Sequence, residues 1–362
     1  MKKRRILLFL AILLLLGLFI LYDNRFNPSV YRAIAGFYHK EITVTENVAF
    51  ENENVPSSTA FRNDLVYYSS SGLRSSSGWE YDLRFVNPKL QSSGGYLLAF
   101  DRGATEMAVF RNYKLAYSIK DTREIINAKV NRSGYTALVT KELGYRGKVT
   151  VYNKRGNEIY KFHSGEKYIM DADVSPDGKR MAVCMLDTSQ DSFVSSVAFF
   201  NLKEDKPTVT YEDTQGIFTN VRYFSGNRVI AVGNKLTAGF DSSGQKVWDY
   251  EYHDAMLQSY SMNSNKAIVL GLRQHNQKIV ILTADGKIYE YVCDTNAEVS
   301  KVDINENAVM AVTSRDVLFL NRKGFFIASQ SFNRDIKDIH IGRSGIRGIV
   351  LYHSNFDFVK VK

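Results

Sequence analysis

The chain has 362 residues and carries 47 Lys and Arg against 38 Asp and Glu, a formal net charge of +9. Four of these charges, Lys2 to Arg5, lie at the amino terminus, and the other basic residues are scattered among acidic neighbours, which argues against a nucleic-acid binder. With 44% hydrophobic residues and only two cysteines, the chain is expected to rely on a large apolar core and not on disulfides.

An apolar segment follows the basic amino terminus. Residues 6–22 contain no charge and would span roughly 25 Å as a helix, at the short end of what a membrane span requires. A cleavable secretory signal is the alternative, but the segment is longer than a usual signal core and no small-x-small cleavage site follows it. We therefore favour an uncleaved signal-anchor helix. The basic flank places residues 1–5 in the cytoplasm, which predicts a single-pass plasma-membrane protein with the remainder outside the cytoplasmic membrane.

The segment 23–60 is interpreted as a stalk. It contains a short amphipathic helix at 28–40, a β-rich stretch at 42–50 and a polar loop at 51–59.

From residue 61 to 362 a unit of about forty residues recurs, built from short apolar strands and polar turns. The turn centres are Gly95, Gly134, Gly178, Asn227, Asn265, Asn307 and Gly345. A repeat of this length made only of strands is typical of a β-propeller. The sequence thus predicts an all-β protein with a single extracytoplasmic propeller.

Seven inner strand pairs can be placed along this domain. They are residues 81–86 with 96–100, 125–130 with 136–140, 169–174 with 180–185, 218–224 with 228–232, 257–262 with 266–270, 299–304 with 309–313, and 336–341 with 347–352. These pairs predict seven blades, and eight blades stay open because residues 65–68 and 69–73 could form half of another hairpin. Only one strand, 356–361, follows the last pair. We therefore expect an amino-terminal strand, 42–50 or 65–68, to close the ring.

Turn chemistry and cysteine placement give two further expectations. Asn153, Asp241 and Asn321 each stand three residues before a Gly, where a short side chain can close an Asx turn and the Gly can adopt positive φ. Cys184 and Cys293 fall in different repeats, so two buried thiols are expected and not a disulfide.

Two repeats resemble known propeller families. The inner turn of TolB-type and other WD-like propellers resembles Ser175-Pro176-Asp177-Gly178 and the strand after it. The quinoprotein-type repeat resembles residues 241–248, which read Asp-x-x-Gly-x-x-x-Trp. The whole layout is similar to an uncharacterised family of membrane-anchored propellers from Gram-positive bacteria. That resemblance implies a WD-like, quinoprotein-like propeller and transfers no functional residue. Trp248 has no counterpart in most repeats and no adjacent cysteines occur, so no cofactor is predicted and Trp248 is interpreted as packing between blades.

One register of the inner strands is unusually polar. Its members are Asn127, Lys129, Asp171, Asp173, Asn220, Arg222, Ser259, Ser261, Lys301, Asp303, Asp338 and His340. We interpret them as candidate residues lining the central channel, a mixed-charge funnel for a small polar ligand or a peptide tip. The competing interpretation is the ordinary wetting of a propeller channel.

Catalytic chemistry has one candidate pair. Asp171 and Asp173 are two residues apart on one strand, about 6.5 to 7 Å, close to the carboxylate separation of inverting glycosidases. The alternative that we favour is that these carboxylates accept hydrogen bonds from neighbouring blades or line the solvent-filled channel. The six histidines lack zinc-ligand spacing, so no catalytic, cofactor-binding or metal residues are assigned. The sequence therefore favours a non-catalytic protein-interaction or cell-envelope scaffold with protein partners, and a carbohydrate-active or other hydrolytic propeller is the alternative.

Overall fold

The computed structural model describes residues 40–49, 55–189, 192–274, 277–293, 298–343 and 346–361. The predicted cytoplasmic tail, the signal-anchor helix and residues 28–39 of the short helix lie outside these residues. None of the helical segments within the described ranges has the length and apolar character that a membrane span needs.

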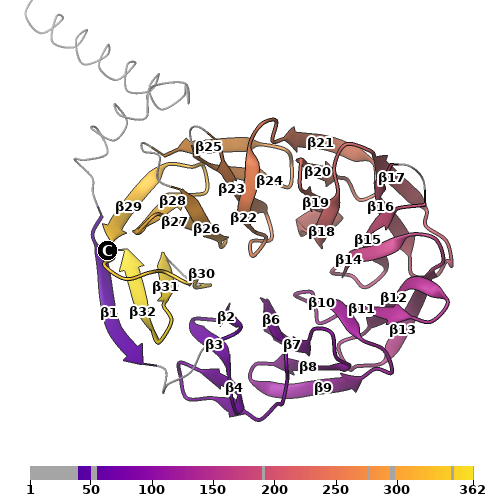
Figure 1. Cartoon of the computed structure of the whole chain (residues 1–362), viewed down its shortest axis with the longest axis horizontal. Helices are drawn as coiled ribbons and strands as arrows, with labels where there is room; N and C mark the ends of the chain where they lie inside the picture. Colours follow the sequence, from indigo (N-terminus) through magenta and orange to yellow (C-terminus); the bar gives the residue numbers. More distant parts are fainter. Residues whose placement is uncertain are drawn as a thin grey trace, which may run out of the picture. The chain divides into compact units, whose positions relative to one another are not determined.

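The described residues form eight four-stranded antiparallel sheets, which lie as blades around a common centre in Figure 1. The number of blades is therefore eight, and the prediction of seven is wrong.

The strands of the first four blades follow chain order. Blade 1 contains β2 (Ser58–Phe61), β3 (Asp64–Ser69), β4 (Gly72–Ser75) and β5 (Glu80–Tyr81). Blade 2 contains β6 (Pro88–Ser93), β7 (Tyr96–Asp101), β8 (Glu106–Arg111) and β9 (Lys114–Lys120). Blade 3 contains β10 (Ile125–Val130), β11 (Thr136–Glu142), β12 (Tyr145–Tyr152) and β13 (Glu158–Ser164). Blade 4 contains β14 (Tyr168–Val174), β15 (Arg180–Asp187), β16 (Val194–Asn201) and β17 (Val209–Asp213).

The other four blades complete the ring. Blade 5 contains β18 (Phe218–Tyr223), the 3-10 turn η2 (Ser225–Asn227), β19 (Val229–Gly233), β20 (Leu236–Phe240) and β21 (Lys246–Glu251). Blade 6 contains β22 (Met256–Ser261), β23 (Ala267–Arg273), β24 (Lys278–Thr283) and β25 (Ile288–Val292). Blade 7 contains β26 (Val299–Ile304), β27 (Ala308–Thr313), β28 (Asp316–Asn321) and β29 (Phe326–Ser331). Blade 8 contains β30 (Asp338–Ile341), β31 (Arg347–Leu351), β32 (Asn355–Val361) and β1 (Ile42–Ala49).

The two ends of the domain close the ring in blade 8. β1 pairs antiparallel with β32, with Ile42 opposite Val361 and Ala49 opposite Asn355. Figure 1 shows the indigo β1 beside the yellow β32. The expected closure by residues 42–50 is confirmed, and this part of the segment assigned to the stalk belongs to the propeller. Without β1, β32 would present an open ladder of backbone groups.

Blade 1 is the eighth blade that the sequence left open, since β3 and β4 form the hairpin suggested by residues 65–73. Residues 65–68 lie on β3, inside a complete four-stranded sheet, and not in a closing strand. The predicted inner strand 81–86 is also wrong, because β6 pairs with β7 over Pro88–Ser93. Val86 lies in the connection before β6 with its side chain 93% exposed. β6 escaped detection because its sequence, PKLQSS, has little apolar character.

Apolar side chains fill the spaces between blades. Each neighbouring pair of blades encloses its own cluster of buried residues, for example Val183, Met185 and Phe200 of blade 4 with Ala137 and Val139 of blade 3. Burying both faces of every blade in this way stabilises the ring, and Cys184 and Cys293 are buried and not joined in a disulfide, as predicted.

Trp248 and the Asx turns occupy the places that the sequence indicated. The Trp248 ring packs beside the cluster between blades 5 and 6, and its Nε1 donates to the Ala284 carbonyl oxygen of blade 6. The Oδ1 atoms of Asn153, Asp241 and Asn321 each accept from the backbone N–H two residues later. The Gly that ends each turn has φ between +77° and +88°, which a residue with Cβ rarely adopts.

Antiparallel blades place their connections on two opposite faces of the disc. One face carries the turns between the first and second strands and between the third and fourth strands of each blade, and we call it the turn face. The loop face carries the connections between second and third strands and those between blades. β1 begins on the turn face, because Ile42 lies opposite Val361 at the end of β32.

Candidate functional site

The candidate residues lie on the innermost strands, where a repeated irregularity sets their orientation. Among the described strands, β10, β14, β18, β22 and β26 each carry a register shift against their second strand. The residues immediately after the shifts are Asn127, Asp171, Asn220, Ser259 and Lys301. A bulge reverses the alternation of side chains along a strand. The polar register of each of these strands therefore begins at its bulge.

This polar register faces the following blade. On β14, Ala172 and Val174 join the apolar cluster toward blade 3, whereas Asp171 and Asp173 lie on the opposite side, toward blade 5. Asp171 accepts from the backbone N–H of Val221 at 2.8 Å, and Asp173 accepts from that of Tyr223 at 2.7 Å. Both carboxylates are buried, and neither lines the central cavity. They join blade 4 to blade 5, which confirms one branch of the favoured alternative, and their expected position on the channel wall is wrong.

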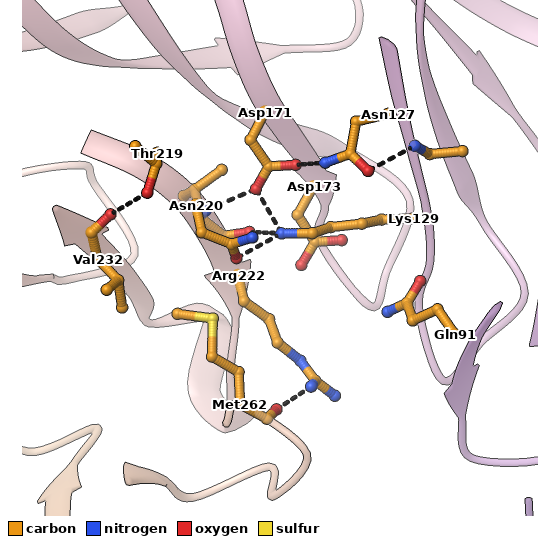
Figure 2. Close-up of polar contacts among 12 residues, drawn as sticks. Gln91, Asn127, Lys129, Asp171, Asp173, Thr219, Asn220, Arg222, Val232 and Met262 are labelled. Carbon is orange, nitrogen blue, oxygen red and sulfur yellow. Dashed lines mark hydrogen bonds and ion pairs between the residues drawn. The ribbon is translucent and has the colours of Figure 1, made fainter. Parts of the chain in front are cut away.

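Lys129 connects three blades. Its Nζ forms an ion pair with Asp171 of blade 4 and donates to the Asn220 side chain and the Val221 carbonyl oxygen of blade 5, both at 2.7 Å. The Nδ2 of Asn127 donates to the other oxygen of Asp171 at 2.7 Å. Figure 2 shows Lys129 reaching Asp171 and Asn220 together. The ammonium is thus held by structural partners.

The next junctions use other side chains for the same purpose. Arg222 of blade 5 donates through its guanidinium to the Met262 carbonyl oxygen in blade 6 (Figure 2). Ser259 accepts from the Val302 N–H of blade 7 at 3.2 Å, and Ser261 donates to Asp303 at 2.6 Å.

Asp303 and His340 complete the pattern around blade 8. Asp303 accepts from Ser261, from Asn263 and from the backbone N–H of Ile341, which lies on β30. His340 Nε2 and Ser58 Oγ are 2.8 Å apart, across the junction of blades 8 and 1. This serine–histidine contact joins two blades like the others, and the Asp303 carboxylate is engaged by its own donors.

The physical reason for this network is the inner edge of each blade. The first strand of each blade pairs with the second strand on one side only. The backbone N–H and C=O groups on its other side have no strand partner and need other hydrogen-bond partners. Polar side chains from the preceding blade supply acceptors for those N–H groups. The described junctions include Leu90 N to Ser57, Val130 N to Gln91, Val221 N to Asp171, Val302 N to Ser259 and Ile341 N to Asp303.

Burial dominates the electrostatics of these carboxylates. It raises the pKa of Asp173 to about 6, against an ordinary value of 3.8. It also raises the pKa of Asp171, and the nearby Lys129 ammonium opposes that rise. The pKa of Asp303 is raised by burial as well. The Cys184 thiol, next to Asp171, has its pKa raised well above the usual range by burial, which leaves it a poor nucleophile.

A cavity of about 770 Å³ occupies the centre of the ring, bounded by the inner strands. The predicted residues on its wall are Asn127, Lys129, Asn220, Arg222, Ser259, Ser261, Lys301, Asp303, Asp338 and His340. Asp338 uses its Oδ1 to accept from the backbone N–H of Ile339, on its own strand. Lys89, Gln91 and Arg102 of blade 2 also line the cavity. Sequence reasoning missed Lys89 and Gln91 because the first strand of this blade was placed seven residues too early, and their polar side chains in PKLQSS were the available signal. Arg102 follows β7, in a connection that carries no polar strand pattern.

Asp171 and Asp173 do not form the acid and base pair of a hydrolase. Inverting hydrolysis needs one carboxyl group free to donate a proton and one free to activate water. Asp171 and Asp173 instead accept hydrogen bonds at both oxygens from Asn127, Lys129 and backbone N–H groups. The arrangement fixes neighbouring blades to one another.

Solved structures with the same fold include two propellers. Sqt1 of Saccharomyces cerevisiae matches with 14% sequence identity and a TM-score of 0.56, over 88% of this chain and 100% of that chain. BamB from Moraxella catarrhalis matches with 12% identity and a TM-score of 0.55, over 88% of this chain and 99% of that chain. At these identities the likeness shows the fold alone, an all-β propeller. A comparison with curated proteins finds no match. The model of a family of unknown function, DUF5711, matches residues 37–361, nearly the whole length, and the chain therefore belongs to that family.

Proposed function

We propose that this protein is a membrane-anchored, extracytoplasmic scaffold that binds a protein partner of the cell envelope through the loop face of its propeller and has no catalytic activity of its own. The observation that carries the proposal is the distribution of exposed apolar side chains. The basic residues 2–5 and the apolar segment 6–22 support the anchored, outward placement.

The loop face carries slightly more than half of the large exposed apolar side chains that the structure describes. Among the described residues, six of the eleven large exposed apolar side chains lie there, namely Val86, Leu143, Tyr145, Tyr168, Phe193 and Met256. Leu143 is 71% exposed and Met256 is 66% exposed. Tyr and Met are enriched where proteins bind one another, since they supply large contact areas. The loop face therefore has the composition of a protein-binding surface.

The inner-strand network supports a scaffold because it makes the loop face rigid. Hydrogen bonds such as that from Lys129 of blade 3 to Asn220 of blade 5, and that from the Tyr223 N–H of blade 5 to Asp173 of blade 4, fix the blades to one another. A surface held in one geometry loses little conformational entropy on binding. The same bonds occupy the carboxylates on which the hydrolytic alternative depended.

Site-specific crosslinking in intact cells tests the binding face. A photoreactive amino acid at Tyr145 or at Met256, both on the loop face, should give a discrete crosslinked protein product. The same amino acid at Lys114, the exposed first residue of β9 on the turn face, is the matched control. Identical products at all three positions, or none at Tyr145 and Met256, would overturn the proposed binding face.

Two further measurements test the remaining parts of the proposal. Protease added to intact cells should digest the propeller, and its protection would overturn the extracytoplasmic placement. Purified protein should give no turnover on cell-wall polymers. Turnover that disappears in both Asp171→Asn and Asp173→Asn would instead establish the hydrolytic alternative.

A further inference from the structure

A second hollow lies on the turn face, away from the central cavity. This groove of about 490 Å³ runs across blades 5, 6 and 7 and includes parts of their first-to-second and third-to-fourth strand turns. Its charged lining residues are Arg228, Lys266, Lys287, Arg322 and Lys323, with Asp285 as the one carboxylate among the described residues that line it. The groove therefore has an excess of four positive charges in a protein whose formal net charge is +9.

Most of these cations are not neutralised by the protein. Arg228 donates to the Ala284 carbonyl oxygen at 3.0 Å, and Lys287 lies 3.7 Å from Asp285. Within the described ranges, the side chains of Lys266, Arg322 and Lys323 make no ion pair. Like charges brought together on three blades repel one another, and this repulsion is relieved when an anion binds between them.

Arg322 presents the groove with a guanidinium group that the described residues leave partly unsatisfied. Its Nε is buried and has no hydrogen-bond acceptor among the described residues. A buried guanidinium N–H without an acceptor is costly, so such groups are usually satisfied by protein, water or an ion. Arg322 lies in an Asx turn whose backbone is fixed by Asn321, so its side chain is held at the groove.

We propose that this groove binds a phosphate-bearing anion. A phosphate group carries close to two negative charges near neutral pH and offers several acceptor oxygens, which matches an excess of positive charge better than a single carboxylate does. Arg228 and Arg322 supply planar donor groups, and Lys266, Lys287 and Lys323 supply mobile ammonium groups.

The phosphate could belong to a soluble molecule or to lipid headgroups. Residue 41 leads into β1 on the same turn face, so a lipid surface is a relevant source to test. The groove does not depend on the proposed partner at the loop face, because the two surfaces lie on opposite faces of the disc. The crosslinking experiment and the one below can therefore fail separately.

Lysine footprinting on the full chain tests the proposal. The protein in neutral detergent is treated with an acetylating reagent with and without inorganic phosphate, and the modification of each lysine is read by mass spectrometry. Bound phosphate should protect Lys266, Lys287 and Lys323 but not Lys120, which is paired with Glu106 in blade 2. A second arm uses the chain reconstituted in vesicles of phosphatidylglycerol with phosphatidylcholine, compared with phosphatidylcholine alone. Protection by dissolved phosphate identifies a soluble ligand, and protection only by phosphatidylglycerol vesicles identifies lipid headgroups.

The chain contains a matched control for the groove. Arg322 and Lys323 lie between Asn321 and Gly324, and Lys154 and Arg155 lie between Asn153 and Gly156 in the same kind of turn of blade 3, outside the groove.

The double variant Arg322→Gln with Lys323→Gln should weaken protection of Lys266 and Lys287 roughly tenfold or more, since two charge-assisted contacts are lost. Lys154→Gln with Arg155→Gln should leave that protection unchanged. Thermal midpoints equal to that of the parent show that both variants are folded. Absence of protection in both arms, or equal loss in the two double variants, would overturn the proposed site.

Discussion

Removal of the Asp171 carboxylate is the most direct test of the junction between blades 3, 4 and 5. Asp171→Ala leaves the Lys129 ammonium without its counter-ion and the backbone N–H of Val221 without its acceptor. The side chain of Asp171 is 1% exposed and that of Lys129 is 12% exposed, so solvent replaces little of what is lost.

The expected cost follows from the burial of this pair. Breaking a buried ion pair by removing one partner costs about 3 to 5 kcal/mol. Spread over the roughly 320 residues of the propeller, that loss lowers the thermal midpoint by about 4 to 7 °C. Asp171→Ala combined with Lys129→Met removes the stranded charge, so the double variant should be less destabilised than the sum of the single variants predicts.

Thermal and urea unfolding, followed by circular dichroism at neutral pH, measure these effects. Asp254→Ala is the control, since Asp254 is exposed, and its effect should stay within about 0.5 kcal/mol. A loss below about 1 kcal/mol for Asp171→Ala would refute the claim that this carboxylate holds the blades together.

Three other predictions address pH, packing and ring closure. Burial raises the pKa of Asp173 to about 6 from 3.8, so the folded state holds the proton of this carboxyl more tightly than the unfolded state does. Deprotonation therefore lowers the stability of the folded state as pH rises from about 4 to about 6, by at most about 3 kcal/mol. Asp173→Asn should therefore gain thermal stability relative to the parent over that range, and a constant difference would contradict the reasoning. Gly239→Ala places a Cβ into the Trp248 ring, so the variant should lose about 1 to 3 kcal/mol of stability and its Trp emission should shift to longer wavelength. Gly165→Ala is the control, because nothing lies within 4 Å of its Cβ, and it should change neither quantity. Deletion of residues 41–49 exposes the edge of β32 and should produce self-association in light scattering; a stable monomer would argue against closure by β1.

The polar register shows how far sequence reasoning can reach. The two-residue period around Asn127, Asp171 and Asn220 indicates correctly that each inner strand has one polar side. It does not indicate what that side faces. In a propeller both sides of a strand face neighbouring blades, so Asp171 and Asp173 meet the backbone of blade 5, and the cavity is reached mainly by residues such as Lys301 and Arg222.

The blade count failed for a related reason. Apolar periodicity finds strands that pack against apolar neighbours, but β6 uses its polar side chains to bond adjacent blades, as Gln91 does with the N–H of Val130 and Ser92 does with the Ala60 carbonyl oxygen. The apolar stretch 81–86 was therefore taken as the strand in its place, and blade 1 was not separated from its neighbour.

By itself the sequence determined the β-propeller fold, the Asx turns at Asn153, Asp241 and Asn321, the two buried cysteines without a disulfide and the use of an amino-terminal strand to close the ring. Each of these depends on local chemistry or on a repeat that is visible along the chain. Only the tertiary structure decided the number of blades, the partners of Lys129 and Asp171, and the gathering of Arg228, Lys266 and Arg322 in one groove. These features depend on how residues of different blades meet. A contact between two blades does not produce a repeating pattern in the sequence.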